Sequence, residues 1–301
     1  MPTLTTLRKA ILISLYGSAA LAAFTPAAMA QSTEAGATDS PVQTVSVVGS
    51  RRVASSATDT MVPVDIIPIS RVAEQGGQFD LAQSLQYISP SFNSTRQTGA
   101  DGADLVDSAA LRGLGSDQTL VLVNGKRRHT TALVNLFGAR NRGNTGTDMN
   151  AIPLLAIKNV QVLRDGAAAQ YGSDAIAGVI DIELKKSLGC EAVAGYSQYS
   201  EGDGKNYMTS AYCGIALGDK GTLAITGEYL DRGRSNRADA DSMRIIGDTK
   251  SQNKTLYLNG DYATSGTGKL YFTAGAYVQD NSGDSKEGAK VTFDKLDIDH
   301  E

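Results

Sequence analysis

The second half of the chain alternates between apolar and polar or small residues. In one segment Leu270, Phe272, Ala274, Ala276 and Val278 occupy every other position. A period of two is typical of β-strands whose two faces meet different surroundings. We therefore expect strands in five segments, with room for a sixth: 189–199, 207–217, 222–230, 254–262 and 270–278.

The segments that join these strands differ in length. Residues 218–221 and 264–268 are short enough for tight turns, whereas 231–253 is long and charged. Bacterial transmembrane β-barrels combine alternating strands with short periplasmic turns and longer external loops. A soluble antiparallel sheet alternates in the same way, so the pattern alone leaves both possibilities open.

The first half of the chain mixes helix and strand signals. A short β-branched run at 64–67 predicts a strand, and 79–87 predicts a small helix that ends at a following Ser-Pro pair. Leu81, Leu85 and Ile88 share one face at helical spacing, so we expect this face to be buried.

Two further strand regions follow this helix. Residues 119–123 lead into Asn124-Gly125, a strong signal for a two-residue hairpin turn. A short helical turn is expected at 152–157, with strands around 160–162 and within 176–184. Together these elements predict a compact α+β domain with one mixed sheet, in which 93–107 and 140–150 are polar loops.

The N-terminus has the features of a cleaved secretory signal. Arg8 and Lys9 precede an apolar run at 10–23, and Ala-Met-Ala at 28–30 has the spacing that signal peptidase accepts. The alternative is a membrane anchor, but the run is shorter than the roughly 20 residues that a spanning helix needs. We expect export, with Gln31 as the first mature residue.

Composition adds little that is decisive. The net charge of −4 gives no support to nucleic-acid binding, which usually shows a basic excess. The mean hydropathy of −0.18 resembles that of a soluble protein, but barrel strands alternate and never form a long apolar run. Trp is absent, and the 12 Tyr can take its place at a membrane interface.

Two stretches carry a family resemblance. They read LRGLGSDQTLVLVNGKRRH at 111–129 and IPLLAIKNVQVLRDGAAAQYGSDAIAGVIDIELKK at 152–186. Both are similar to the plug domain of TonB-dependent outer-membrane receptors. The resemblance implies an α+β plug domain followed by antiparallel transmembrane β-barrel strands. We expect a signal peptide at 1–30, a flexible leader at 31–57, a plug domain at 58–187 and barrel strands at 188–301.

The resemblance also implies a function. Such receptors reach the outer membrane after Sec-type export. There they import a scarce nutrient of the iron-siderophore, cobalamin or carbohydrate type. The implied partners are TonB with its inner-membrane energy-transducing complex, a small-molecule ligand and outer-membrane lipid, and no nucleic acid. The alternative is an exported plug-only protein that binds a partner without transport.

A short alternating segment precedes the plug-like region and resembles a TonB box. An extended peptide of this kind can add itself as an edge strand to a partner's sheet. The competing interpretation is an ordinary first strand of the plug. The residues of the segment are Val42, Gln43, Thr44, Val45, Ser46, Val47 and Val48.

The chain is short for the family that it resembles. Residues after 188 allow five or six strands of about ten residues each, whereas a barrel that holds a plug has about 22 strands. We therefore expect an N-terminal fragment or a truncated product of a larger receptor. Alone it should not insert stably, because an open sheet leaves backbone groups unsatisfied in lipid.

The resemblance suggests two sets of site residues. Loops on a rigid scaffold often carry recognition, so the ligand-facing candidates are Arg96, Asp101, Asp104, Arg140, Asn141, Arg142 and Asn144. Ion pairs between plug and barrel are expected from Arg112, Arg127 and Arg164 to Glu191, Glu228 and Asp261. Solvated surface charge is the alternative for each of these residues.

The two cysteines, Cys190 and Cys213, fall in the first two predicted barrel strands. If the hairpin turns near Gly202, they lie about opposite each other, so a disulfide is possible in an oxidising compartment. Two free thiols are equally compatible with the sequence, because cross-strand geometry is often wrong for a bridge.

An enzyme is not expected. His129 and His300 have no zinc-like spacing with carboxylates, and no serine lies in a G-x-S-x-G sequence. Gly113-Leu114-Gly115 lacks the third glycine of a dinucleotide-binding fingerprint, because residue 118 is Gln. We expect no catalytic residue, no metal site and no cofactor.

Overall fold

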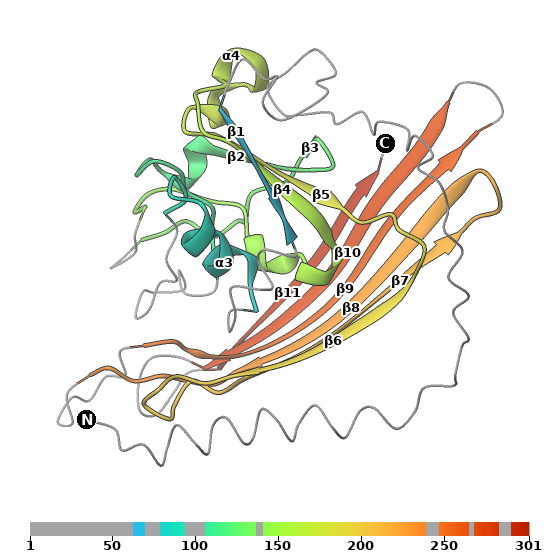
Figure 1. The fold of residues 1–301 in the computed structure, drawn as a ribbon. Helices are drawn as coiled ribbons and strands as arrows, with labels where there is room; N and C mark the ends of the chain where they lie inside the picture. The colour runs from blue at the N-terminus through green and yellow to red at the C-terminus, as the bar shows by residue number, and fades with distance from the viewer. Residues whose placement is uncertain are drawn as a thin grey trace, which may run out of the picture. The chain divides into compact units, whose positions relative to one another are not determined.

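The computed structural model describes residues 63–69, 79–93, 106–136, 141–238, 247–264, 268–282 and 290–300. These residues lie within one compact unit, Gln43–Glu301. They form a mixed α+β domain, here called the N-terminal domain, followed by a second sheet (Figure 1). None of the described helices is long and apolar enough to cross a membrane.

The N-terminal domain is built on a five-stranded sheet in the order β1-β4-β5-β2-β3. Strands β2 and β5 are parallel and the other neighbours are antiparallel, which confirms the predicted mixed sheet. The strands are β1 (Val64–Pro68), β2 (Thr119–Val123), β3 (Lys126–Arg127), β4 (Ile157–Leu163) and β5 (Gly178–Leu184).

The predicted Asn-Gly turn joins β2 to β3. Asn124 and Gly125 both have positive φ, 51° and 79°. This combination suits a tight hairpin, because the twist of such a turn matches the twist of the strands. The turn pairs Val123 with Lys126, so the basic residues after it are held at the edge of the sheet.

Helix α3 (Leu81–Ile88) begins where Asp80 caps it. The Asp80 side chain accepts a hydrogen bond from Gln83 N at 2.9 Å, which satisfies one backbone donor of the first turn. The remaining helices are one turn each: η3 (Ser116–Gln118), η4 (Met149–Ala151), η5 (Leu154–Ala156), α4 (Ala168–Tyr171) and η6 (Ser173–Ala175).

The core lies on both faces of the N-terminal sheet. One face packs Ile180, Ile182 and Leu184 of β5 against Leu81 and Leu85 of α3. The other face holds a smaller cluster around Leu120, Leu122 and Val179. Strand β5 therefore contributes buried apolar residues to both faces of the sheet.

The second sheet is antiparallel, and each strand pairs with its neighbour in the chain (Figure 1). Strands β8 and β9 extend into the predicted long loop, because their ladder continues to Arg232 opposite Ser251. The strands are β6 (Gly189–Ser197), β7 (Asn206–Ala216), β8 (Gly221–Arg232), β9 (Lys250–Ala263), β10 (Lys269–Ser282) and β11 (Lys290–His300).

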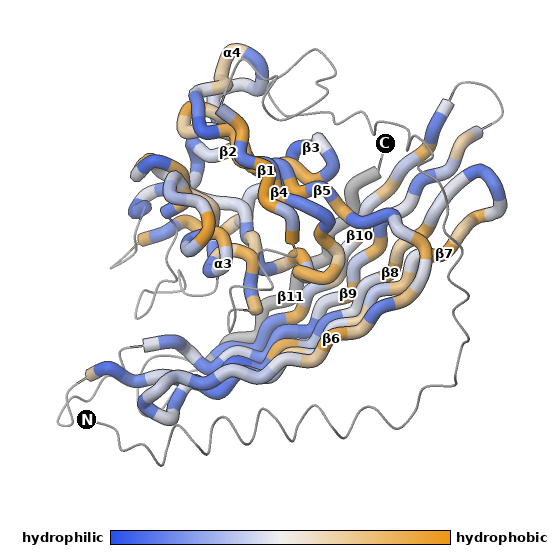
Figure 2. The backbone as a smooth tube through the Cα atoms, in the orientation of Figure 1, coloured by the Kyte–Doolittle hydropathy of each residue, from blue (hydrophilic) through white to orange (hydrophobic). Residues whose placement is uncertain are grey.

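The two faces of the second sheet differ as their alternation predicts. On β9, the side chains of Thr255, Tyr257 and Asn259 are buried. Leu256 and Tyr262, which have the opposite strand parity, are exposed. Figure 2 shows hydrophobic and hydrophilic residues following one another along these strands. One face is therefore polar and covered, and the other is apolar and open.

Replacing Gly178 by Ala should destabilise the N-terminal domain. Gly178 has φ 140°, and an added Cβ would overlap the Leu163 carbonyl oxygen and lie 2.9 Å from Leu111 Cδ1. We expect the free energy of unfolding in urea to fall by roughly 2–4 kcal/mol. The control is Gly166→Ala, whose Cβ would meet nothing closer than 3.4 Å. Equal losses in the two variants would contradict the argument.

Candidate functional site: the polar interface between the N-terminal domain and the second sheet

The polar face of the second sheet is buried in the described structure. Its residues share alternating positions on neighbouring strands and side chains that carry hydrogen-bonding groups. Buried polar groups are stable only when they are hydrogen-bonded. The buried residues of this face include Ser210, Thr226, Ser251, Asn253, Thr255, Asn259, Asp261, Gln279 and Asn281.

Asn124 of the hairpin turn links the N-terminal domain to this face. Its Nδ2 donates to Asn259 Oδ1 at 3.2 Å, and its Oδ1 accepts from the backbone N–H of Leu184 at 2.9 Å. Asn259 Nδ2 in turn donates to the Lys185 carbonyl at 3.0 Å. One side chain therefore joins the turn, the end of β5 and the middle of the second sheet.

A buried ion pair forms a second link. Arg232 Nη2 on β8 lies 3.2 Å from Asp80 Oδ2, and both side chains are less than 10% exposed, at 7% and 5%. The other oxygen of Asp80 caps α3. The Asp80 carboxylate therefore caps the N-terminus of α3 and also binds β8. Nearby, Arg128 Nη1 donates to the Tyr257 hydroxyl at 3.5 Å.

The three arginines expected to pair with the barrel instead bind groups of the N-terminal domain. Arg112 donates to the carbonyls of Ala177 and Ile176, at 3.1 and 3.2 Å. Arg127 pairs with Asp174, and Arg164 pairs with Asp65 at 2.9 Å. The expectation came from the family resemblance together with charge and strand parity, and none of these gives the distance between two particular segments.

The carboxylates expected on the barrel wall also have other partners. Glu191 pairs with Lys185, and Asp261 lies 2.7 Å from Lys269 and 3.4 Å from Lys186. Glu228 forms no ion pair within the described ranges. Lys185 and Lys186 directly follow β5, so the short connection between the two sheets supplies the cations.

The ligand-facing candidates are only partly described. Asn141 has φ 58° and its carbonyl accepts from Asn144 N at 3.0 Å, so these residues form a tight turn with Arg142 exposed at its tip. Arg96, Asp101, Asp104 and Arg140 lie outside the described residues. So do the signal peptide, the leader and the TonB-box segment, Val42 to Val48.

The two cysteines are joined by a disulfide. Cys190 on β6 and Cys213 on β7 are direct partners in the antiparallel register, with 4.1 Å between their Cα atoms. Both have the strand parity of the apolar face. The described ranges contain no cluster of three or more side chains suited to a metal ion.

Asp181 is a buried carboxyl in the middle of β5. Its Oδ1 accepts a hydrogen bond at 3.0 Å from the backbone N–H of Gly125, which lies in the turn between β2 and β3. Burial raises the pKa of Asp181 to about 6, against the opposing effect of that hydrogen bond, and the nearby charge of Glu183 adds to the rise.

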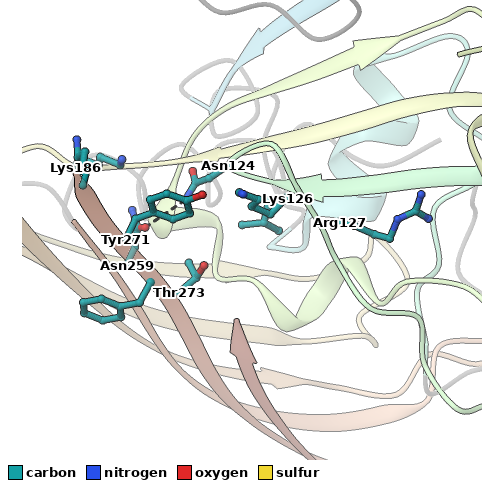
Figure 3. Close-up of a pocket in the computed structure, with 10 residues that line it drawn as sticks. Asn124, Lys126, Arg127, Lys186, Asn259, Tyr271 and Thr273 are labelled. Carbon is teal, nitrogen blue, oxygen red and sulfur yellow. Dashed lines mark hydrogen bonds between the residues drawn. The ribbon is translucent and has the colours of Figure 1, made fainter. Parts of the chain in front are cut away.

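A cavity of about 490 Å³ lies between hairpin β2–β3 and strands β9 and β10 (Figure 3). Asn124, Lys126, Lys186, Asn259 and Tyr271 are among its lining residues. Sequence reasoning treated Asn124 as a turn residue only, and it did not single out Asp80, Arg232 or Asn259. The Asp-x-x-Gln spacing at 80–83 is a capping signal that could have identified Asp80.

Breaking the buried ion pair should loosen the N-terminal domain from the sheet. We expect Arg232→Met and Asp80→Asn each to lower the free energy of unfolding in urea by about 3–5 kcal/mol, because each removes one member of a buried charge pair. The double variant should lose less than the sum of the two. Arg127→Met, which removes the exposed pair with Asp174, should cost below about 1 kcal/mol. Strictly additive losses from the buried pair would refute the coupling.

Asp181→Asn should stabilise the protein at neutral pH. Folding raises the pKa of this carboxyl from 3.8 to about 6. Its contribution to folding stability is therefore fully present below pH 3.8 and is lost as the pH rises through 6, where the buried carboxyl must ionise. The shift corresponds to about 3 kcal/mol. The substitution keeps the acceptor for Gly125 N–H, so unfolding in urea should show a gain at pH 8 and little change at pH 4. A gain of equal size at both values would contradict the assignment.

Comparison with known proteins identifies the N-terminal domain. The model of the TonB-dependent receptor plug domain matches residues 56–179. The vitamin B12 transporter BtuB of Vibrio cholerae serotype O1 is 30% identical over 203 residues, which are 65% of this chain and 29% of the transporter. The ferric enterobactin receptor of Pseudomonas aeruginosa is 28% identical over 182 residues, 60% of this chain and 24% of the receptor. The chain therefore spans less than a third of the length of these relatives.

Solved structures show the same fold. A ferric enterobactin receptor mutant of Pseudomonas aeruginosa, PfeA, superposes with a TM-score of 0.59 at 22% identity, over 74% of this chain and 35% of that one. The siderophore receptor PirA of Acinetobacter baumannii gives 0.59 at 21% identity, over 75% and 32%. These relatives are named as transporters and receptors. This chain contains a plug domain of the TonB-dependent receptor type at 56–179, followed by antiparallel strands.

Proposed function

We propose that this chain takes part in the TonB-dependent uptake of a scarce nutrient across the outer membrane. The observation that carries the proposal is the two-faced second sheet, whose polar face covers the plug domain while its apolar face is exposed. A transmembrane barrel needs an apolar face for lipid and a polar face for its lumen. Leu256, Leu270 and Phe272 would then contact outer-membrane lipid.

The nutrient class follows only from the relatives. One is named as a vitamin B12 transporter and others as ferric enterobactin or siderophore receptors. A cobalamin or an iron-siderophore complex is therefore the first ligand to test, with a carbohydrate as a further class. The fold alone does not choose among them.

The connections suggest an orientation. Leu217 N donates to the Gly221 carbonyl and Thr264 N to that of Gly268, so both of these connections are tight turns. Short turns face the periplasm in bacterial barrels, and longer loops face outward. The outer end would then hold Arg232 with Asp80. Hairpin β2–β3 would face the periplasm.

The polar interface suits a plug that must move. A hydrogen bond between plug and wall can be replaced by one to water, so the net cost of exchanging it is only about 0.5–1.5 kcal/mol. Separating an apolar interface of the same size would expose its whole surface to water. TonB would pair with the segment Val42 to Val48 and pull, and the plug would yield along its hydrogen-bonded face.

Val45→Pro should weaken TonB binding strongly, because proline removes a backbone donor from an added strand. We expect the purified chain to bind the periplasmic domain of TonB, and the variant to bind at least about tenfold more weakly in calorimetric titration. Ser46→Ala keeps the backbone donor and is the matched control, with little change expected. Unchanged binding by Val45→Pro would refute the assignment of the TonB box. In a complete receptor the same variant should bind its ligand normally and lose uptake.

A further inference from the structure

A short segment, residues 185–187, joins the plug domain to the second sheet and is here called the linker. It follows the end of β5 directly and comes just before β6, which begins at Gly189. The linker belongs to no helix or strand, and most of it is exposed. Irregular, exposed segments with few fixed contacts usually open more easily than the elements beside them. The contacts of this linker point the other way.

The backbone of the linker is bonded to side chains of the sheet. The Lys185 carbonyl accepts from Asn259 Nδ2 on β9 at 3.0 Å, and the Ser187 carbonyl accepts from the Tyr212 hydroxyl on β7 at 2.7 Å. The centre of the Tyr212 ring also lies 5.5 Å from Lys185 Nζ. Gly214 on β7 and Asn259 on β9 oppose the same residue of β8, so the linker crosses β8 between them. A Cβ at Gly214 would overlap the Ser187 carbonyl oxygen, so glycine lets the linker lie close to the sheet.

The two lysines of the linker reach carboxylates on different strands. Lys185 pairs with Glu191 on β6, and Lys186 Nζ lies 3.4 Å from Asp261 Oδ2 on β9. The Asp261 side chain is only 8% exposed, and its other oxygen accepts from Thr222 N and Oγ1 of β8, at 3.1 and 2.7 Å. A carboxylate that is already fixed loses less side-chain freedom when it pairs than a mobile one does. The linker is therefore held through both its backbone and its side chains.

Asn259 lies at the boundary between the linker and the rest of the plug domain. Its Nδ2 donates to the Lys185 carbonyl, whereas its Oδ1 accepts from Asn124 of hairpin β2–β3. Different atoms make the two bonds, so the hairpin can leave the sheet without releasing the linker. Exchanging the bond from Asn124 for one to water has a small net cost. The linker would have to give up two backbone bonds and two ion pairs together.

We propose that the linker is a clamp that stays on the sheet when the plug domain leaves it. Displacement of the plug ends at Lys185, so the residues before it can move or unfold while the linker and the sheet keep their arrangement. In the receptor proposed above, the linker would be the fixed point against which TonB pulls. That role rests on the proposed function, whereas the resistance of the linker to release does not.

Trypsin tests this proposal on the purified full chain without any substitution, because it cleaves after lysine. Lys158 lies within β4 and reports opening of the plug domain, whereas Lys185 and Lys186 report release of the linker. An exposed irregular segment with two adjacent lysines is ordinarily among the first sites to be cut. We expect the reverse in short digestions at increasing urea, with the cuts identified by mass spectrometry. Cleavage after Lys185 and Lys186 should need about 1 M more urea than cleavage after Lys158.

A pair of tyrosine variants separates the linker contacts from general stability. Tyr212→Phe keeps the ring and removes the hydroxyl that donates to the Ser187 carbonyl. It should lower the urea concentration for cleavage of the linker by roughly 0.5 M and leave that for Lys158 unchanged. The matched control is Tyr229→Phe, which removes a hydroxyl from the exposed face of the same sheet and should change neither value.

Cleavage after Lys185 or Lys186 at the same urea concentration as cleavage after Lys158, or at a lower one, would overturn the proposal. An equal effect of the two tyrosine variants would also overturn it, because the hydroxyl of Tyr212 would then have no particular role at the linker. Neither TonB nor a nutrient is present in these digestions. Loss of the proposed uptake function would therefore leave their result unchanged.

Discussion

The structure depends on a simple constraint, which is that a buried polar group must find a hydrogen-bond partner. The plug domain covers the polar face of the second sheet, so side chains of that face are matched by groups of the plug. Asn124 with Asn259 and Asp80 with Arg232 are such matches. These pairs fix the register of the contact between the two parts, and Tyr257 of the second sheet joins the plug core.

Local features of the fold could be predicted from the sequence. The Asn124-Gly125 turn depends on two adjacent residues, and the strands of the second sheet depend on alternation within about ten residues. Both were found where expected, although β8 and β9 run further because pairing between Arg232 and Ser251 sustains the ladder. Fold class and family followed from the same short-range information and from two recognisable stretches of sequence.

The interface contacts could not be predicted in this way. Asp80 and Arg232 are 152 positions apart, and their pairing depends on how a helix start meets the end of a strand. Arg112, Arg127 and Arg164 were expected from the resemblance to pair with the barrel, but each contacts an acceptor of its own domain. Charge and parity identify which residues face inward, and only the three-dimensional arrangement identifies which of them meet.

The disulfide has a consequence for the order of assembly. Cys190 and Cys213 are 23 positions apart and lie in the first hairpin after the plug domain. They can meet once these two strands have been made, before β8 to β11 are in place. Because the bond joins directly opposed residues, a hairpin shifted by one position, with its faces exchanged, could not form it without distortion. An oxidising periplasm would thus select the correct pairing of the first two strands, on which each later strand is added.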